Sequence, residues 1–76
     1  MTELIEFVAK SLVDHPDDVQ VFTQDRGDQT VVELEVAPDD LGKVIGRQGR
    51  TARAIRILLA AATQRSRRRF TLDIID

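Results

Sequence analysis

The apolar residues of this chain change between helical and alternating spacing, and the order of these changes restricts the folds that it can adopt. Over residues 3–13 they recur at helical intervals, which predicts an amphipathic helix with Thr2 available as its N-cap. Over 19–23 and 30–37 apolar and polar residues alternate, and the segment 25–29, which holds two Asp and a Gly, separates the two runs. This pattern predicts two antiparallel strands joined by a turn.

The second half of the chain predicts two further helices and a closing strand. The segment 38–40 resembles a helix entrance, and its helix has room for about two turns before Gly46. The segment 50–64 is Ala-rich and free of Gly and Pro, which favours a longer helix. Alternation returns at 70–76 and predicts the last strand. The predicted core positions are Val32, Leu34 and Val36 on a strand, Ile55, Leu58, Leu59 and Ala62 on the long helix, and Phe7, Phe22 and Phe70.

This order of elements, α-β-β-α-α-β, indicates an α+β fold. The last two strands are joined by a crossover of about 30 residues that contains two helices, so they are expected to be parallel, with a right-handed crossover. The expected architecture is a three-stranded mixed sheet with the helices packed on one face. We find no repeat or linker, and predict a single domain over residues 1–76.

The joint between the two consecutive helices is the sequence Gly-Arg-Gln-Gly at residues 46–49. Its glycines permit a tight turn with positive φ and allow a ligand to approach the backbone closely. The free N–H groups and the dipole of the following helix add positive potential over the turn. Arg50, Arg53 and Arg56 extend a cationic stripe along that helix. The joint therefore suits a phosphate backbone, although two glycines at this spacing also fit a plain helix connector.

The charges of the chain are divided between its two halves. Residues 1–40 hold eleven acidic residues and two basic ones, whereas residues 41–72 hold nine basic residues and no acidic one. A half without carboxylates attracts anions, and a polyanion such as nucleic acid is the expected partner. The alternative is that the two halves neutralise each other in the folded chain. The turn carboxylates are expected to be solvated, and they are Asp17, Asp18, Asp39 and Asp40.

Several classes of protein are excluded by what the sequence lacks. Without Cys and with His15 as the single His, it has no thiol catalyst and no ordinary zinc ligand set. No P-loop is formed, because Gly49 is followed by Arg and Thr. We expect no enzyme, cofactor or small-molecule substrate. No apolar run approaches 18 residues and the N-terminus is acidic, so we expect a cytoplasmic protein without a membrane partner. With no Tyr or Trp, an aromatic platform for bases is not expected.

The stretch LGKVIGRQGRTARAI resembles the signature of the KH RNA-binding domain, V-I-G-x-x-G followed by a helix. The whole chain is similar to small bacterial single-KH proteins of the KhpA type, with the element order of the type II KH fold. The resemblance implies that loop 46–49 clamps the sugar-phosphate backbone of about four nucleotides. It also implies a groove between the two helices and the last strand. The apolar wall of that groove would be Leu41, Val44, Ile45 and Ala54, and the small Ala52 departs from the family pattern.

The arginines between the long helix and the last strand are a second candidate contact. By the resemblance, Arg65 and its neighbours could close over the far side of the groove, while in the alternative reading they complement the helix dipole. The candidate RNA-binding residues are Lys43, Ile45, Gly46, Arg47, Gln48, Gly49, Arg50, Arg53, Arg67, Arg68 and Arg69.

The predicted function is non-catalytic binding of short single-stranded RNA, in an RNA chaperone or a post-transcriptional regulator. The resemblance implies a homodimer and a heteromer with a larger RNA-binding protein of the KhpB, or Jag, type. The alternative function is a protein-interaction module, whose basic face docks an acidic partner or another copy of the chain.

Overall fold

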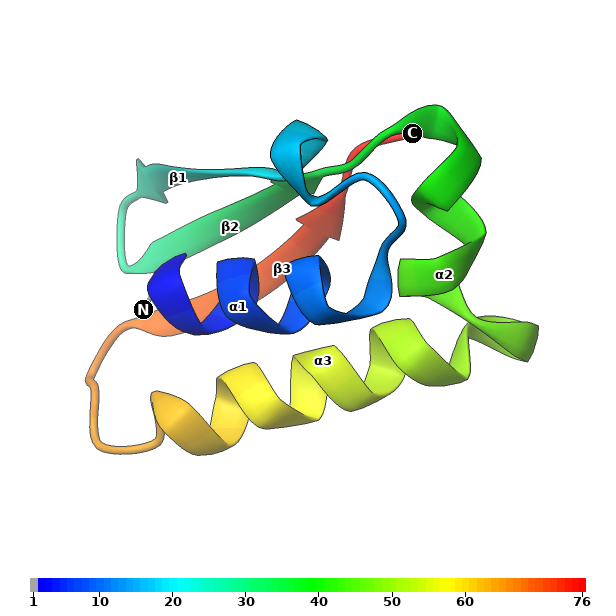
Figure 1. Ribbon diagram of the computed structural model, residues 1–76. Helices are drawn as coiled ribbons and strands as arrows, with labels where there is room; N and C mark the ends of the chain where they lie inside the picture. The colour runs from blue at the N-terminus through cyan, green and yellow to red at the C-terminus, as the bar shows by residue number, and fades with distance from the viewer. Residues whose placement is uncertain (1) are drawn as a thin grey trace.

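A computed structural model describes residues 2–76 and confirms the predicted order of elements (Figure 1). In chain order they are α1 (Thr2–Leu12), the 3-10 turn η1 (Pro16–Asp18), β1 (Gln20–Arg26), β2 (Gln29–Glu35), the 3-10 turn η2 (Pro38–Asp40), α2 (Leu41–Ile45), the 3-10 turn η3 (Arg47–Gly49), α3 (Arg50–Ala62) and β3 (Arg69–Ile74). The N-cap prediction for Thr2 is wrong, because α1 already includes Thr2 as its first residue. None of the helices within residues 2–76 has the length and apolarity to cross a membrane.

The three strands form one mixed sheet in the order β1-β2-β3, as predicted. β1 pairs with β2 antiparallel, and β3 pairs with β2 parallel. The crossover from β2 to β3 runs through α2 and α3, and Figure 1 shows α1 and α3 on the same side of the sheet. The α+β fold with helices on one face is therefore confirmed.

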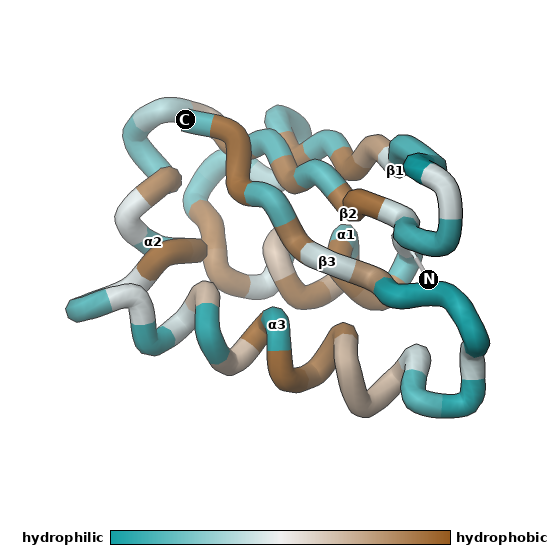
Figure 2. Tube along the Cα trace, turned by 180° about the vertical axis from the view of Figure 1, so that it is seen from behind, coloured by the Kyte–Doolittle hydropathy of each residue, from teal (hydrophilic) through white to brown (hydrophobic). Residues whose placement is uncertain are grey.

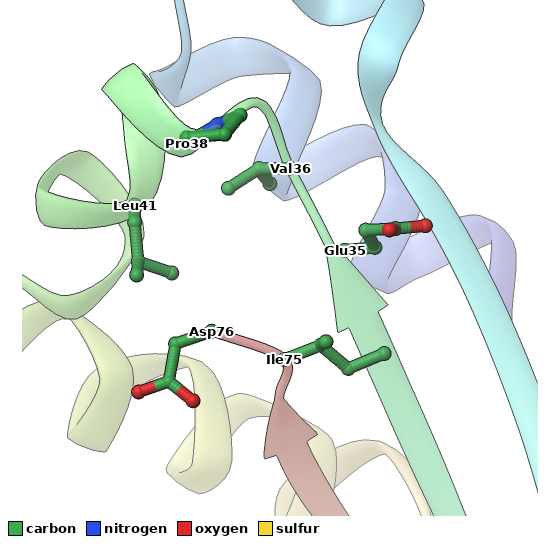
Figure 3. Close-up of a pocket in the computed structure, with 6 residues that line it drawn as sticks. All are labelled: Glu35, Val36, Pro38, Leu41, Ile75 and Asp76. Carbon is green, nitrogen blue, oxygen red and sulfur yellow. The ribbon is translucent and has the colours of Figure 1, made fainter.

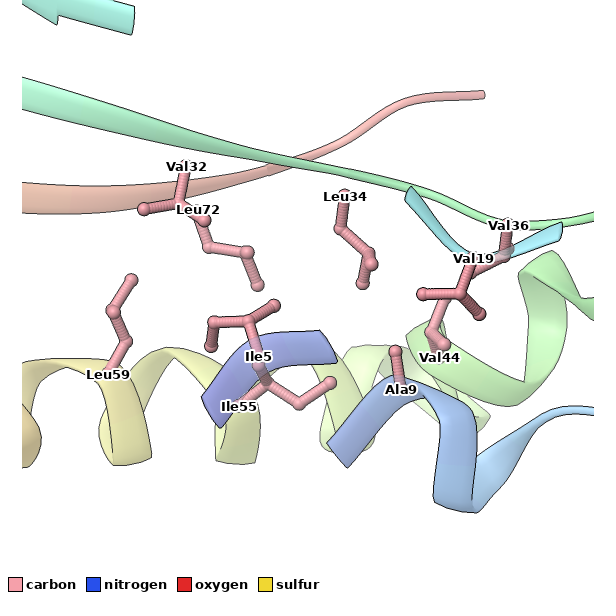
Figure 4. Close-up of a cluster of buried hydrophobic side chains, with 10 residues drawn as sticks. All are labelled: Ile5, Ala9, Val19, Val32, Leu34, Val36, Val44, Ile55, Leu59 and Leu72. Atoms are coloured by element: carbon pink, nitrogen blue, oxygen red, sulfur yellow. The ribbon is translucent and has the colours of Figure 1, made fainter. Parts of the chain in front are cut away.

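The core lies between the sheet and the helices (Figure 4). Along β2 the inward positions Val32 and Leu34 are fully buried, which confirms the alternation read from the sequence. Ile5 of α1 and Leu59 of α3 meet them from the helical layer. Burying one such aliphatic side chain contributes roughly 1.5–3 kcal/mol, so this layer holds α3, and the loop before it, against the sheet. The remaining members of the core are Ala9, Val19, Val36, Val44, Ile55 and Leu72.

The predicted buried face of α3 is wrong at two positions. Ile55 and Leu59 are buried as expected, but Leu58 is 40% exposed and Ala62 is exposed. Ala52 is buried instead, and its spacing from Ile55 and Leu59 places the three on one side of the helix. This side faces the sheet, whereas Leu58 is turned toward α1.

The core prediction is also wrong for two of the three phenylalanines. Phe7 is 70% exposed because the core stripe of α1 runs through Ile5 and Ala9, on the other side of the helix. Phe22 is 45% exposed because it points to the sheet face that no helix covers. Phe70 packs against the core. The two exposed rings lie on opposite sides of the molecule, so they do not form a common stacking platform.

Candidate nucleic-acid interface

The loop 46–49 has an unusual backbone. Gly46 has φ 77° and ψ 171°, Gln48 has φ 57° and Gly49 has φ 74°. Gln48 is the one residue other than glycine with positive φ within residues 2–76. An L-residue in this region carries a cost of about 1–2 kcal/mol, which the surrounding packing must offset. The loop is therefore a defined turn between α2 and α3.

The two glycines of the loop are needed for different reasons. A Cβ on Gly46 would overlap the side chain of Thr51 and would lie 2.8 Å from its backbone nitrogen, so the chain there packs directly on the first turn of α3. A Cβ on Gly49 would meet no atom within 4 Å, so glycine is favoured at this position only because of the positive φ. Gly46 thus brings α2 against α3, and Gly49 leaves open space beside the start of α3.

The backbone donors of the loop are only partly used. The N–H of Gly46 donates to the carbonyl of Gly42 at 2.8 Å, and the N–H of Gly49 donates to the carbonyl of Gly46 at 3.1 Å. The N–H groups of Arg47 and Gln48 have no acceptor among the described residues. Together with the N-terminus of the 13-residue helix α3, they offer donors and a positive dipole to an anion over the turn.

The arginines around this loop are exposed and free of carboxylates. The side chains of Arg47, Arg50 and Arg53 make no hydrogen bond or ion pair with any described residue. Of the nine cations in residues 41–72, only Lys43 and Arg68 pair with an acidic residue of the described chain. Mutual neutralisation of the two halves is therefore wrong as a general explanation, and the loop keeps its positive charge.

Lys43 belongs to a structural contact at the start of α2. Its Nζ lies 3.2 Å from Asp14 Oδ2 and 3.9 Å from Asp40 Oδ1. Asp40 is only 1% exposed, so its predicted solvation is wrong, whereas Asp17, Asp18 and Asp39 are exposed as predicted. The carboxylate of Asp40 accepts the N–H groups of Asp14 at 3.2 Å and of His15 at 2.9 Å. It ties the segment after α1 to the helix that carries the loop.

This arrangement determines the protonation of Asp40. Burial by itself raises the pKa of its carboxyl, but the N–H groups of Asp14 and His15 and the charges of His15 and Lys43 outweigh burial and lower the pKa below its usual value. Asp40 is therefore a structural anion at neutral pH. No group of three or more His, Cys, Asp or Glu residues within 2–76 could hold a metal ion.

The segment between α3 and β3 is fixed by one of its arginines. Arg68 Nε donates to Thr30 Oγ1 at 2.9 Å, and Arg68 Nη2 donates to the carbonyl of Gln29 at 2.8 Å. Nη2 also lies 3.6 Å from Oδ1 of Asp25, near the end of β1. Arg67 and Arg69 are exposed and have no side-chain partner among the described residues.

The helix-dipole reading is wrong within α3 itself, because the helix ends at Ala62 and its last turn holds no basic residue; for the arginines that follow the helix it stays an alternative. The structure thus divides the three predicted contacts into one fixed side chain, Arg68, and two free ones, Arg67 and Arg69. The contacts of Arg68 join residues that are 38 and 39 positions apart, and no local sequence signal marks them.

The predicted apolar wall is not brought together as one surface. Val44 is fully buried in the core, and Leu41 and Ile45 are half-buried. Ala54 lines a different hollow, which faces α1. Leu41 lines a hollow of about 230 Å³ between α2 and the ends of β2 and β3, and Figure 3 shows Leu41 and Val36 pointing into it. The other residues around it are Glu35, Pro38, Ile75 and Asp76.

The chain matches known proteins over almost its whole length. A family model described as KhpA/KhpB, KH domain, matches residues 2–74. A protein of Halalkalibacterium halodurans named RNA-binding protein KhpA is 55% identical over 76 residues, which cover all of both chains. Relatives of the same name from Clostridium acetobutylicum and Streptomyces coelicolor are 51% and 47% identical, over 99% and 100% of this chain and 100% and 92% of their own. No solved structure matches the chain.

Proposed function

Because the chain belongs to the KhpA/KhpB KH-domain family, we propose that it binds short single-stranded RNA by clamping the sugar-phosphate backbone on loop 46–49. KH proteins of this kind bind RNA and are not enzymes, so the chain is not expected to catalyse a reaction, and the prediction of a non-enzyme is confirmed by the family. We assign it the type II arrangement of a single KH domain, on the order of its elements.

The observation that carries this proposal is the set of unpaired arginines and N–H groups around a turn of defined backbone conformation. Gly46, Gln48 and Gly49 hold the loop at positive φ, and the N–H groups of Arg47 and Gln48 have no protein acceptor within residues 2–76. A phosphate over the turn would accept those donors and meet the Arg47 guanidinium, with Arg50 one turn along. A plain connector between helices requires none of these free donors.

The other candidate residues have graded roles in this proposal. Arg50 and Arg53 contact RNA phosphates that lie along α3, and Arg67 and Arg69 contact phosphates farther along the RNA. Ile45, half-buried beside the loop, offers an apolar surface to a base. Lys43 and Arg68 contribute long-range charge, because their own contacts hold them on the protein. We propose a cytoplasmic RNA chaperone or post-transcriptional regulator.

The salt dependence of RNA binding tests this proposal. We expect the affinity for a fluorescent, unstructured RNA of mixed sequence to fall with salt at a log–log slope of about −2 to −3, because three or four phosphates are contacted at about −0.7 each. Fluorescence anisotropy over a range of KCl concentrations gives this slope. Absence of binding at low salt, or a slope near zero, would contradict the phosphate clamp.

The alternative function, docking of the basic face on an acidic protein, is favoured by the same free arginines. It differs in what the loop must do, because an acidic protein surface does not require the free N–H groups of Arg47 and Gln48. Failure of RNA binding in the salt titration would leave this alternative as the better reading.

We further propose that the chain associates with a second copy through the outer surface of α1 and α3. Phe7 and Ile57 are 70% and 64% exposed on these helices, and Leu12 and Leu58 beside them are 39% and 40% exposed. A hollow of about 220 Å³ lies between the two helices. The charges of α1 sum to −1 and those of α3 to +3, so a copy that packs its α1 on the partner's α3 is favoured electrostatically. We propose the KhpB-type heteromer on the resemblance alone.

The substitution Ile57→Lys is expected to give a monomer, because it places a charge in this apolar surface. The control is Phe22→Lys, which places the same charge on another exposed apolar residue, on the uncovered face of the sheet opposite Glu33. Sedimentation equilibrium measures the mass of each. A natural protein that is monomeric at micromolar concentration, or equal effects of the two substitutions, would refute this surface.

A further inference from the structure

The sheet has one face that no helix covers. In Figure 2, which is the view from behind, β3 lies in front of α1 and no helix lies over it. Successive side chains of a strand point to opposite faces of the sheet, and Val32, Leu34 and Leu72 point to the core. The residues that alternate with them therefore point outward, away from the helices.

The strand register arranges these outward residues in rows that run across the sheet. From the turn between β1 and β2 onward, three successive rows are Arg26, Gln29 and Arg69; Gln24, Val31 and Thr71; and Phe22, Glu33 and Asp73. The first row is cationic, the middle row has no charge, and the third row is anionic and carries an aromatic ring. The uncovered face thus has opposite charges on the two sides of a neutral middle row.

A single copy of the chain leaves these charges unpaired. None of the four charged side chains in the three rows forms an ion pair with a described residue. Arg26 Nη2 donates to Oε1 of the neutral Gln24 at 2.9 Å. Glu33 and Asp73 lie side by side on neighbouring strands, and like charges in this position are destabilising. The cationic and anionic rows lie about 13 Å apart along the strands, so one copy cannot bring them together.

We propose that this face pairs with the same face of a second copy, sheet against sheet. A two-fold axis along the middle row places the cationic row of each copy on the anionic row of the other, because both rows lie about 7 Å from the axis. Arg69 then faces Asp73 of the second copy, and Arg26 faces the ring of Phe22 in a cation–π contact. Sheets packed face to face lie about 10 Å apart, a gap that side chains from both sheets fill.

This surface is distinct from the surface formed by α1 and α3, which lies on the other side of the sheet. It holds fewer large apolar residues, and exposed ion pairs contribute little, so its pairing is weaker and needs several hundred micromolar protein. At micromolar concentration the pairing is not populated, and Phe22→Lys stays a control for Ile57→Lys there. Because loop 46–49 lies between α2 and α3, paired copies present two loops, which can bind one RNA together if the proposed clamp holds.

The test exchanges the charges of Arg69 and Asp73 in protein that carries Ile57→Lys, which blocks association through the helices. Sedimentation equilibrium at several hundred micromolar, at low salt and without RNA, measures the association. We expect the parent to dimerise, and Arg69→Asp and Asp73→Arg each to dimerise at least about tenfold more weakly, because each turns two attractive contacts per dimer into repulsive ones. The double variant Arg69→Asp/Asp73→Arg forms both contacts in the opposite sense, and its association should return to within about threefold of the parent's.

Arg67→Asp is the matched control, since it makes the same change of net charge as Arg69→Asp on an exposed residue outside the sheet. Its association should stay close to that of the parent. A parent that remains monomeric would overturn the pairing. Unchanged association in both single variants, a double variant as weak as they are, or equal losses in Arg67→Asp and Arg69→Asp would overturn the two-fold arrangement. All of these measurements are made without RNA, so they leave the proposed phosphate clamp to its own test.

Discussion

The double substitution Arg47→Asp/Gln48→Asp is expected to abolish RNA binding while the chain stays folded. It replaces one cation and one neutral residue of the loop with two anions, a change of three charges next to a bound phosphate. At about 1 kcal/mol per unit charge at contact distance in water, this amounts to about 3 kcal/mol, or on the order of 100-fold in affinity. Fluorescence anisotropy with a mixed-sequence RNA at low salt measures this loss.

The fold should tolerate this change for reasons that the structure supplies. Both side chains are exposed and make no hydrogen bond or ion pair with a described residue. Gln48 has φ 57°, a region in which Asp is more favourable than Gln. Asp at this position also lies before the N-terminus of α3, where negative charge is stabilising. The melting temperature should therefore stay within a few degrees of that of the natural protein.

The matched control is Gln24→Asp/Arg26→Asp, which makes the same change of net charge on exposed residues of β1. These residues lie in the hairpin, and Figure 1 places it at the other end of the molecule from the loop. Binding by the control should fall only slightly, through long-range charge. Equal losses in the two variants would mean that net charge, and not the loop, determines affinity.

The fold could be predicted from the sequence because its signals are local. The alternation in 30–37 and the helical spacing in 3–13 each depend on neighbouring residues, and they gave β2 and α1 within one or two positions. The parallel pairing of β3 followed from the crossover that precedes it. The side that each helix buries was predicted less accurately. The pattern of α3 allowed two apolar stripes, and Leu58 was placed on the wrong one because the position of α1 is not encoded locally.

The candidate site was predictable at its loop and not around it. The glycine spacing of 46–49 indicated positive φ, and the structure confirms it at both glycines. The contacts of Asp40 and Arg68 join residues 25 or 26, and 38 or 39, positions apart in the chain. Such contacts depend on how the elements pack, and a single sequence does not show which distant residues come together. That RNA binds at these residues stays a prediction.

Asp40→Asn is expected to be the most destabilising conservative substitution of a carboxylate in this chain. The buried carboxylate accepts two N–H groups from the segment after α1, and the amide of Asn has only one oxygen to accept them. One buried N–H would lose its acceptor, and Lys43 would lose part of its negative partner. We expect the melting temperature at pH 7 to fall by roughly 10 °C or more, measured by circular dichroism.

The effect of Asp40→Asn should depend on pH in a defined direction. The pKa of Asp40 is lower in the folded chain than in the unfolded chain, so its contribution to stability is complete above the unfolded value, near 4, and is lost as the pH falls through the folded value. The natural protein should therefore lose stability below about pH 4, and the difference from Asp40→Asn should shrink there.

The neighbouring residue provides the control for this prediction. Asp39 is exposed and belongs to the same 3-10 turn, so Asp39→Asn makes the same chemical change without removing a buried acceptor. Its melting temperature should stay within a few degrees of the natural value at every pH. An equal loss in both variants, or a deficit of Asp40→Asn that stays constant from pH 7 to pH 3, would contradict the structural role assigned to the Asp40 carboxylate. A loss confined to Asp40→Asn would mean that α2, and with it the loop 46–49, is held in place from the end of α1.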